Sequence, residues 1–206
     1  NNFLVDRSGK MSKSSGEFLR VQLLIDKGYH PLAYRLMCLQ AHYRSELEFN
    51  WDGLGAALTR LKRLVMAAMP AREAEATEIS DRRLVDLLAK FDAAISDDLN
   101  TAVALTLLEE AAALKKIDAG QKRTALATMD EVLGLQFLTL SRQDFRVRPK
   151  AATIDENEIE ATLLQRKEAR AAKDFAASDA LRDELIAAGV EVMDGDPLGW
   201  DWRLDN

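Results

Sequence analysis

Four stretches with apolar residues at helical spacing follow one another between Asn50 and Gly134, and each is bounded by residues typical of helix ends. In the first stretch, Leu54, Leu58 and Leu61 would line one face of a helix. Such a face is stable when it packs against another helix. The stretches therefore predict an antiparallel helical bundle. The expected helices begin at Asn50 or Asp52, at Ser80, at Asn100 and at Gln121, and a loop is expected from Pro70 to Glu78.

The residues before the bundle predict one strand and two helices. Asn1–Asp6 is typical of a strand that runs into a loop. Because no partner strand is evident nearby, we interpret the chain as a carboxy-terminal piece whose sheet lies upstream. A helix is expected from Phe18 to Lys27 before Gly28, and another from Pro31 to about residue 42, since proline suits the first helical position.

The residues after the bundle predict a linker and then a small mixed module. Residues 141–154 are mostly polar. Phe145 and Val147 alternate there with Arg146 and Arg148, and this alternation allows one short strand. Asp155 and Asp174 can each cap a helix. Two short strands about a turn are expected over Val190–Met193 and Trp200–Arg203.

The fold class that these patterns predict is mainly α, with the bundle followed by a small α/β module that ends in a short hairpin. Trp200 and Trp202 alternate along the last expected strand. We expect one of the two rings to pack inward and the other to cover the surface.

Composition restricts the class of protein. The 206 residues contain no apolar run near eighteen residues and no secretory pattern, so we expect a soluble, cytoplasmic protein that spans no membrane. Cys38 is the single cysteine, which excludes an internal disulfide and a multi-thiolate zinc site within this chain. The net charge of −6 argues against binding nucleic acid by bulk electrostatics, although residues 1–64 carry ten Lys and Arg against six Asp and Glu.

The stretch Lys10-Met11-Ser12-Lys13-Ser14 is the clearest candidate for a site. Two ammonium groups among serine hydroxyls and freely turning backbone can surround a phosphate. The alternative is a solvated Lys/Ser linker, which an arbitrary pair of lysines three residues apart usually is.

This pentapeptide resembles the signature loop of class I aminoacyl-tRNA synthetases, and further stretches resemble the cysteinyl-tRNA synthetases in the right order. The chain departs from the family at Ser15-Gly16-Glu17, where Leu-Gly-Asn is usual, and this puts the tuning of the loop in doubt. The matching stretches are Asp26-Lys27-Gly28, Ala41 to Arg44, Asp97 to Ala102, Arg166 to Arg170 and Lys173 to Leu185.

The resemblance implies an enzyme that forms cysteinyl adenylate from cysteine and ATP with Mg²⁺ and then transfers cysteine to its tRNA. It implies that the Rossmann catalytic domain and the ligands of a zinc ion expected in the full-length enzyme are absent from this chain. We expect a monomer, and the sequence itself leaves the oligomeric state open. We expect the fragment alone to be inactive. The implied parts are the end of the catalytic domain with the ATP loop and a stem-contact region (1–53), the helical bundle (54–140), a linker (141–154) and an anticodon-binding module (155–206).

Within the loop, the resemblance places ATP against the residues from Lys10 to Ser14. For Met11, anchoring of the loop on apolar surface is the equal alternative to contact with the nucleotide. Negative charge develops on the departing pyrophosphate, and a fixed cation there stabilises the transition state. We expect Lys13 to supply that charge, with Lys10 in support.

Within the last module, the resemblance implies that four residues read the anticodon. Single-stranded bases are read by stacking and by hydrogen bonds to their edges, which a guanidinium, a phenyl ring and carboxylates can supply. The structural alternatives are a core phenylalanine and a solvated helix face. The implied anticodon residues are Arg170, Phe175, Asp179 and Asp194, and Arg166, Lys173 and Arg182 are candidates for phosphate contact.

Other functions remain open at this point. Cys38 and His42 share a helix face, but two ligands do not make a zinc site, and we expect Cys38 to lie in the core. One alternative enzyme is the related cysteine ligase of mycothiol biosynthesis, which joins cysteine to an amino-sugar inositol and needs no anticodon module. A non-enzymatic alternative is a stand-alone tRNA-binding helical module.

Overall fold

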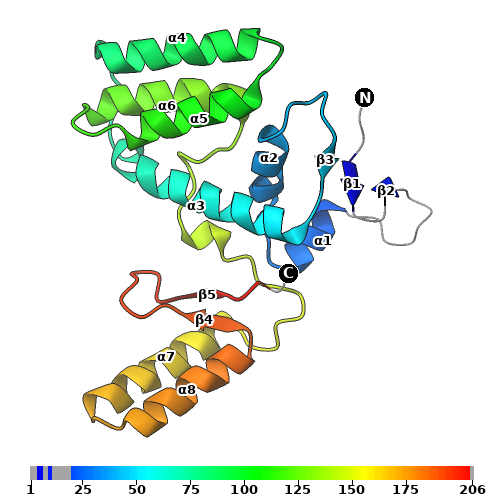
Figure 1. The fold of residues 1–206 in the computed structure, drawn as a ribbon. Coiled ribbons are helices and arrows are strands. Elements are labelled where there is room, and N and C mark those ends of the chain that lie inside the picture. Colours follow the sequence, from blue (N-terminus) through cyan, green and yellow to red (C-terminus); the bar gives the residue numbers. More distant parts are fainter. Residues whose placement is uncertain (1–3, 7–8, 11–19, 205–206) are drawn as a thin grey trace. The chain divides into compact units, whose positions relative to one another are not determined.

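The computed structural model describes residues 4–6, 9–10 and 20–204. The contacts divide the chain into two compact units. The first unit contains residues 31–144 together with the strands β1 and β2, and the second contains residues 20–30 and 145–204 (Figure 1). Within the described residues, no helix combines the length and the apolar character that a membrane span requires.

The first unit begins with a small sheet. Strand β1 (Leu4–Asp6) pairs antiparallel with β2 (Gly9–Lys10) and parallel with β3 (Leu47–Glu48). The expectation that the first strand has no partner nearby was therefore wrong. The parallel partner lies about forty residues further on, beyond helix α2 (Pro31–Leu39), and no local pattern identifies a pairing over that separation. Proline does begin α2, although the helix ends three residues before His42.

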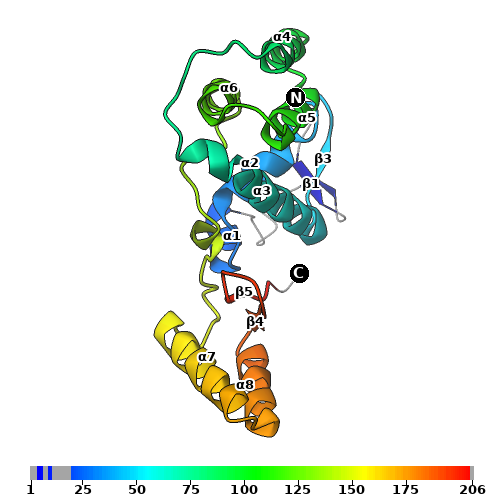
Figure 2. The same cartoon turned by 90° about the vertical axis from the view of Figure 1, so that its left-hand side faces the viewer.

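The predicted helical bundle is confirmed. It consists of α3 (Trp51–Arg72), α4 (Arg82–Ser96), α5 (Thr101–Ala113) and α6 (Ala119–Leu133). Figure 2 looks along α4, α5 and α6, which lie side by side. The facing sides of the four bundle helices bury aliphatic side chains. The fully buried ones include Leu54, Leu61, Leu84, Leu105, Leu108, Leu126 and Met129.

The helix ends differ in detail from the prediction. Asn50 and Asn100 cap α3 and α5 as expected, and Gly134 ends α6 in the left-handed conformation. Helix α4 is capped by Asp81 rather than by Ser80, because the carboxylate of Asp81 accepts the backbone N–H of Arg83 at 2.9 Å. The remaining difference is the start of α6, which begins after Asp118, two residues before Gln121.

Helix α3 continues through Pro70, where a loop was expected to start. A proline within a helix removes one helical hydrogen bond, and its ring crowds the carbonyl four residues before it. Ala68 and Ala71 flank it and are 1% and 0% exposed, so tertiary packing holds the last turn. The guanidinium of Arg72 also donates to the carbonyl of Leu140 at 2.9 Å.

The second unit contains α1 (Val21–Asp26), α7 (Glu156–Ala171), α8 (Phe175–Ala187), and the strands β4 (Val190–Val192) and β5 (Trp200–Trp202). Helices α7 and α8 lie side by side, and β4 and β5 form the predicted antiparallel hairpin (Figures 1 and 2). The predicted caps Asp155 and Asp174 are confirmed. The short strand expected within residues 141–154 is not formed, since η2 (Gln143–Phe145) is a 3₁₀ turn and residues 146–153 are irregular.

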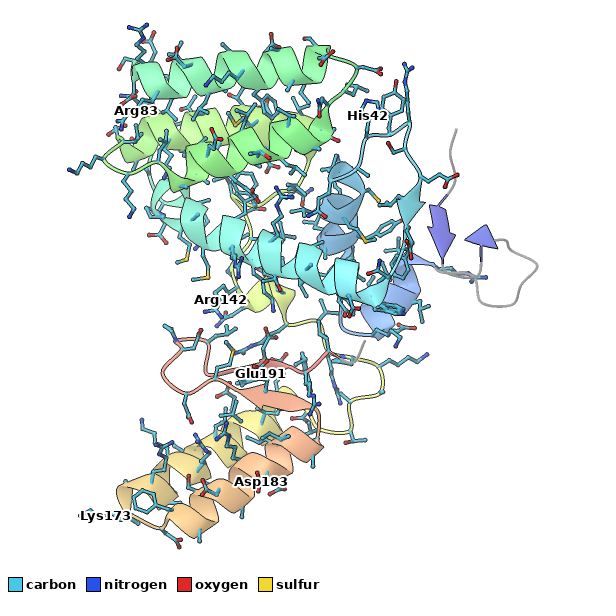
Figure 3. All side chains as sticks on the ribbon, viewed as in Figure 1. His42, Arg83, Arg142, Lys173, Asp183 and Glu191 are labelled. Carbon is cyan, nitrogen blue, oxygen red and sulfur yellow. The ribbon has the colours of Figure 1, made fainter. Side chains whose placement is uncertain are left out.

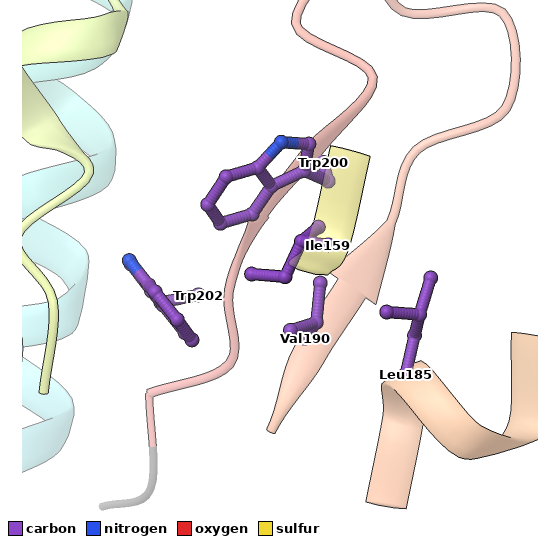
Figure 4. Packing of buried hydrophobic residues seen from close by; sticks show 5 residues of the cluster. All are labelled: Ile159, Leu185, Val190, Trp200 and Trp202. Carbon is purple, nitrogen blue, oxygen red and sulfur yellow. The ribbon is translucent and has the colours of Figure 1, made fainter. Parts of the chain in front are cut away.

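Both tryptophans of β5 are buried, so the expectation that one covers the surface was wrong. Residues two apart on a strand point to the same face. Trp200 and Trp202 are 1% and 4% exposed and meet edge to face at 5.3 Å between ring centroids. With Ile159, Leu185 and Val190 they form the core of the module (Figure 4).

The segment from Arg146 to Lys150 packs beside this core. The guanidinium of Arg146 lies 4.0 Å from the centroid of the Trp200 ring and donates to the carbonyls of Leu198 and Trp200. The end of α1 meets the same segment, because the carbonyl of Asp26 accepts the N–H of Lys150 at 2.8 Å. These contacts place residues 20–30 in the second unit.

Candidate nucleic-acid interface

The predicted phosphate loop lies largely outside the described residues. Lys10 ends strand β2, where its backbone pairs with Val5, and residues 11–14 are not among those described. The roles expected for the five residues of this loop therefore stay predictions.

Three of the four predicted anticodon residues, Arg170, Phe175 and Asp179, lie on α7 and α8, and helix capping sets the break between these two helices. Helix α7 begins with a reciprocal capping box between Asp155 and Glu158. Lys173 takes the left-handed conformation at φ 63°, and the Asp174 carboxylate then accepts the N–H of Ala177 at 3.0 Å to start α8. The expected break at residues 173–174 is confirmed, and Figure 3 shows Lys173 at this turn.

Phe175 is the first residue of α8 and is 62% exposed. A phenyl ring this open to solvent contributes little to the core. The structural alternative given above, a core phenylalanine, is therefore wrong. The ring is free to stack on another flat group.

The hairpin between β4 and β5 presents Asp194 in its turn. The N–H of Met193 donates to the carbonyl of Gly199 at 2.8 Å, and the N–H of Gly199 donates to the carbonyl of Asp196 at 2.9 Å. Gly195 has a φ of +81°, which a residue with a side chain adopts only with strain. The turn is therefore held by its own backbone, and it brings Asp194 against α7.

Arg166 of α7 forms a two-pronged ion pair with Asp194. Its two terminal nitrogens donate to the two carboxylate oxygens at 2.7 and 2.8 Å. Arg170, one turn further along the helix, reaches the same carboxylate at 3.5 Å. Arg166 is 6% exposed, whereas half of the Asp194 side chain is open to solvent.

The charges around this pair shift the titration of Asp194. The hydrogen bonds from Arg166, and then the positive charges of Arg166, Arg170 and Arg182, lower the pKa of Asp194 below its ordinary value. The carboxylate is thus ionised at neutral pH. Its favourable contribution to stability is present above the ordinary pKa of an aspartate and is lost as the pH falls through the lowered value.

A groove of about 790 Å³ opens beside the pair, between α7 and the hairpin turn. Arg170 and Asp194 both line it, so the structure brings these two predicted residues together. Phe175 and Asp179 are not among its lining residues, and they lie on α8. Its other lining residues include Glu160, Leu163, Leu164, Lys167, Met193 and Asp196.

The three candidates for phosphate contact differ in their surroundings. Lys173 and Arg182 are exposed and can meet a phosphate. Arg166 is buried, and both of its terminal nitrogens are bonded to Asp194. Its donors are therefore not available to a phosphate. The ion pair between Arg166 and Asp194 was not predicted from the sequence. The only local signal was the spacing of four between residues 166 and 170, which places both guanidinium groups on one helix face.

A second polar cluster lies in the first unit, around the turn between α4 and α5. The Asp98 carboxylate accepts the hydroxyl of Tyr43 at 2.6 Å and a guanidinium nitrogen of Arg44 at 3.1 Å. His42 stacks on Tyr43 and contacts the carbonyl of Asp98 at 3.1 Å. This cluster joins two connections that were predicted as separate motifs, and His42 is marked in Figure 3.

Metal ligands do not gather in the described part of the chain, where no three His, Cys, Asp or Glu side chains lie close enough to hold an ion. Cys38 is partly buried on α2, and this burial raises the pKa of its thiol.

Known proteins resemble this chain both in its last module and over nearly its whole length. A family model described as the cysteinyl-tRNA ligase anticodon binding domain matches residues 156–203. A cysteine–tRNA ligase of Novosphingobium aromaticivorans is 67% identical over 99% of this chain, which corresponds to 42% of that relative. One of Zymomonas mobilis is 46% identical over 98% of the chain and 46% of the relative. One of Pseudomonas aeruginosa is 35% identical over 95% of the chain and 42% of the relative.

The chain thus spans less than half the length of the curated relatives it matches. The matched region is the carboxy-terminal portion of those relatives. Residues 156–203 thus match the anticodon binding domain of the cysteine–tRNA ligases, and nearly the whole chain is similar to the carboxy-terminal portion of those proteins.

Proposed function

We propose that this chain is the tRNA-binding part of an enzyme that uses ATP to join cysteine to its tRNA through a cysteinyl adenylate. In this proposal the module of α7, α8 and the hairpin reads the anticodon. The loop from Lys10 to Ser14 binds the phosphates of ATP and its magnesium ion, with Lys13 facing the departing pyrophosphate and Lys10 in support.

The observation that carries the proposal is the groove between α7 and the hairpin turn, within the matched anticodon binding domain. Its wall holds an ionised acceptor, Asp194, beside a cationic donor, Arg170, with 3.5 Å between their polar atoms. The edge of every nucleobase presents donors and acceptors side by side. A splayed-out base can therefore meet complementary groups in this groove.

Four exposed residues extend the surface on which a single strand would lie. Phe175 supplies a face for stacking, which is worth about 1–3 kcal/mol per base in proteins that bind single strands. Lys173 and Arg182 supply positive charge for the phosphate backbone, and Asp179 supplies a further acceptor on α8. An anticodon-reading module distinguishes this proposal from the cysteine ligase of mycothiol biosynthesis, which has no tRNA to read.

The proposal is tested by measuring anticodon discrimination with the 206-residue chain. One tRNA carries the cysteine anticodon, and a second has the same body with all three anticodon bases changed. We expect the first to bind at least about tenfold more tightly in a fluorescence anisotropy titration at fixed salt. Equal affinities for the two tRNAs would contradict the proposal.

Asp194→Asn is the site variant for the same titration, and Asp183→Asn is its matched control. Both changes remove one negative charge from the module, but Asp183 lies on α8 and does not line the groove (Figure 3). We expect Asp194→Asn to reduce discrimination and Asp183→Asn to leave it unchanged. A loss of discrimination in both variants would point to bulk charge instead of a base contact.

A further inference from the structure

Arg166 is a charged residue of the module whose side chain is almost completely buried together with an ionic partner. It is 6% exposed on a helix whose other charged residues face solvent. Burying a guanidinium costs free energy unless its charge and its donors are satisfied. The partner that satisfies it is Asp194, which lies 28 positions further along the chain.

Stability alone does not account for this arrangement. A buried ion pair is often no more stable than apolar residues of the same volume, because both ions lose their hydration. The Nε of Arg166 adds to that cost, since it is buried with no hydrogen-bond partner among the described residues. Both of the hydrogen bonds that the structure gives to this guanidinium go to Asp194.

The fork fixes the direction of the Asp194 carboxylate. Each carboxylate oxygen has two lone pairs, and Arg166 occupies one lone pair on each oxygen. Arg170 lies at 3.5 Å from Oδ2, a distance at which it contributes charge more than a hydrogen bond. The half of the side chain that stays open to solvent therefore offers the remaining lone pairs to the groove in a fixed orientation.

We infer that Arg166 is a positioning residue for anticodon reading: it holds the Asp194 carboxylate so that its free lone pairs accept the amino or imino N–H of one anticodon base. The inference rests on the proposed function, because it needs a base in the groove. It assigns Arg166 no contact with the tRNA itself. A single acceptor held from behind by a two-pronged donor cannot rotate to suit a different base, and this restriction is the source of the discrimination.

The groups that face Asp194 come from both helices. Arg166 and Arg170 approach from α7, and the charge of Arg182 reaches it from α8. The charge of Asp179, also on α8, acts on Arg166. The other charged residues that line the groove are Glu160, Lys167 and Asp196.

The first test compares Arg166→Lys and Arg166→Met in the anticodon titration. Lysine keeps the positive charge but cannot form the fork, and methionine keeps most of the volume without charge. We expect the ratio of the two tRNA affinities to fall about tenfold in Arg166→Met, the effect of losing one good base contact, and to fall in part in Arg166→Lys. Circular dichroism and thermal melting establish that each variant is folded. An unchanged ratio in a folded variant would overturn the inference.

A double-mutant cycle separates positioning from independent action. In the Asp194→Asn background, Arg166→Lys should cause no further loss of discrimination, because the carboxylate that it positions is gone. Additive losses from the two changes would show that Arg166 acts without Asp194, which would overturn the inference.

A carboxyl titration by NMR provides a readout that needs no tRNA. With ¹³C-labelled aspartate, the signal absent from Asp194→Asn is that of Asp194. It should titrate below the ordinary range in the unchanged chain and move upward in Arg166→Met. An Asp194 signal with the same midpoint in both proteins would show that the guanidinium does not hold this carboxylate.

Two matched variants control the titrations. Arg60 also forms a two-pronged ion pair with Glu109 in the helical bundle, through Nε and one terminal nitrogen at 2.5 and 2.9 Å, so Arg60→Lys breaks a two-pronged pair elsewhere. It should leave discrimination unchanged. Lys167→Met removes a charge from the groove wall and should weaken both tRNAs alike. If the unchanged chain itself fails to discriminate, the proposed function fails, whereas a discriminating chain whose Arg166 variants discriminate equally well overturns only the present inference.

Discussion

At the scale of single residues, the buried charges of this protein are tied to backbone and side-chain partners that the sequence does not reveal. Lys122 of α6 is 8% exposed, and its ammonium donates to the carbonyls of Ala112 and Leu114 at 2.5 and 2.8 Å. Burial lowers the pKa of Lys122. These carbonyls end α5, where helix carbonyls lack intrahelical partners and a cation is favourable. Lys122 thus joins the end of one bundle helix to the start of the next.

We therefore expect Lys122→Met to destabilise the protein. Methionine retains the apolar stem but leaves two carbonyls at the end of α5 without their donor, at a cost of about 2 kcal/mol. Urea unfolding at pH 7 measures the difference. Lys90→Met, at an exposed position of α4, is the control and should change the free energy of unfolding by less than about 0.5 kcal/mol. Equal stabilities of the Lys122 and Lys90 variants would show that the two hydrogen bonds contribute nothing.

At the scale of elements, the helices follow from local signals and their boundaries from contacts. Caps at Asn50, Asn100, Asp155 and Asp174 were readable because a side-chain oxygen at a helix start has a local partner two or three residues on. The continuation of α3 through Pro70 could not be predicted from the sequence, because it depends on the tertiary burial of the neighbouring alanines, which offsets the lost hydrogen bond. The pairing of β1 with β3 was likewise decided by the fold of the intervening chain.

The start of α6 depends on a close approach between elements. A Cβ at Gly120 would lie 2.4 Å from the carbonyl oxygen of Glu75 and 2.7 Å from the hydroxyl oxygen of Thr77, in the connection between α3 and α4. The first of these atoms is backbone and cannot rotate away. A glycine is therefore required at this position by the neighbouring segment and not by its own helix.

Gly120→Ala should destabilise the protein by roughly 2 kcal/mol, since relief of the clash requires a backbone shift. Gly53→Ala is the matched control, because Gly53 also lies in the first turn of a bundle helix and its nearest neighbour there is the side-chain oxygen of Asn50 at 3.0 Å. In that position alanine gains helix propensity and should be close to neutral. Chemical unfolding of both variants decides the point, and a Gly120→Ala protein as stable as the unchanged chain would contradict the close approach.

At the scale of the whole molecule, charge determines how a polyanion can bind. The net charge is −6, so the chain as a whole does not attract RNA by bulk electrostatics. The second unit nevertheless presents exposed basic residues on and beside the helix pair that carries the groove. These are Lys167, Arg170, Lys173 and Arg182.

We expect a weak salt dependence of tRNA binding by the 206-residue chain. Four cationic contacts to a single strand correspond to a slope of about −3 when the logarithm of the association constant is plotted against the logarithm of the salt concentration. Anisotropy titrations at several potassium chloride concentrations give this slope. Lys173→Met should reduce the magnitude of the slope by about 0.7, the contribution of one phosphate contact. Lys90→Met on α4 should leave the slope unchanged. A slope twice as steep would mean that binding extends over other surfaces.

The sequence by itself determined the helical bundle, the break between α7 and α8, and the terminal hairpin, because caps, apolar spacing and turn residues act within a few positions of one another. Through resemblance it also predicted one site made of Arg170, Phe175, Asp179 and Asp194, of which Arg170 and Asp194 line the same groove. Only the tertiary structure decided that Arg166 turns inward, that both tryptophans of β5 are buried, and that residues 20–30 pack in the same unit as the module. Each of these depends on a contact between residues far apart in the chain. For Arg166 the deciding contact is the Asp194 carboxylate, whose charge is what makes a buried guanidinium tolerable.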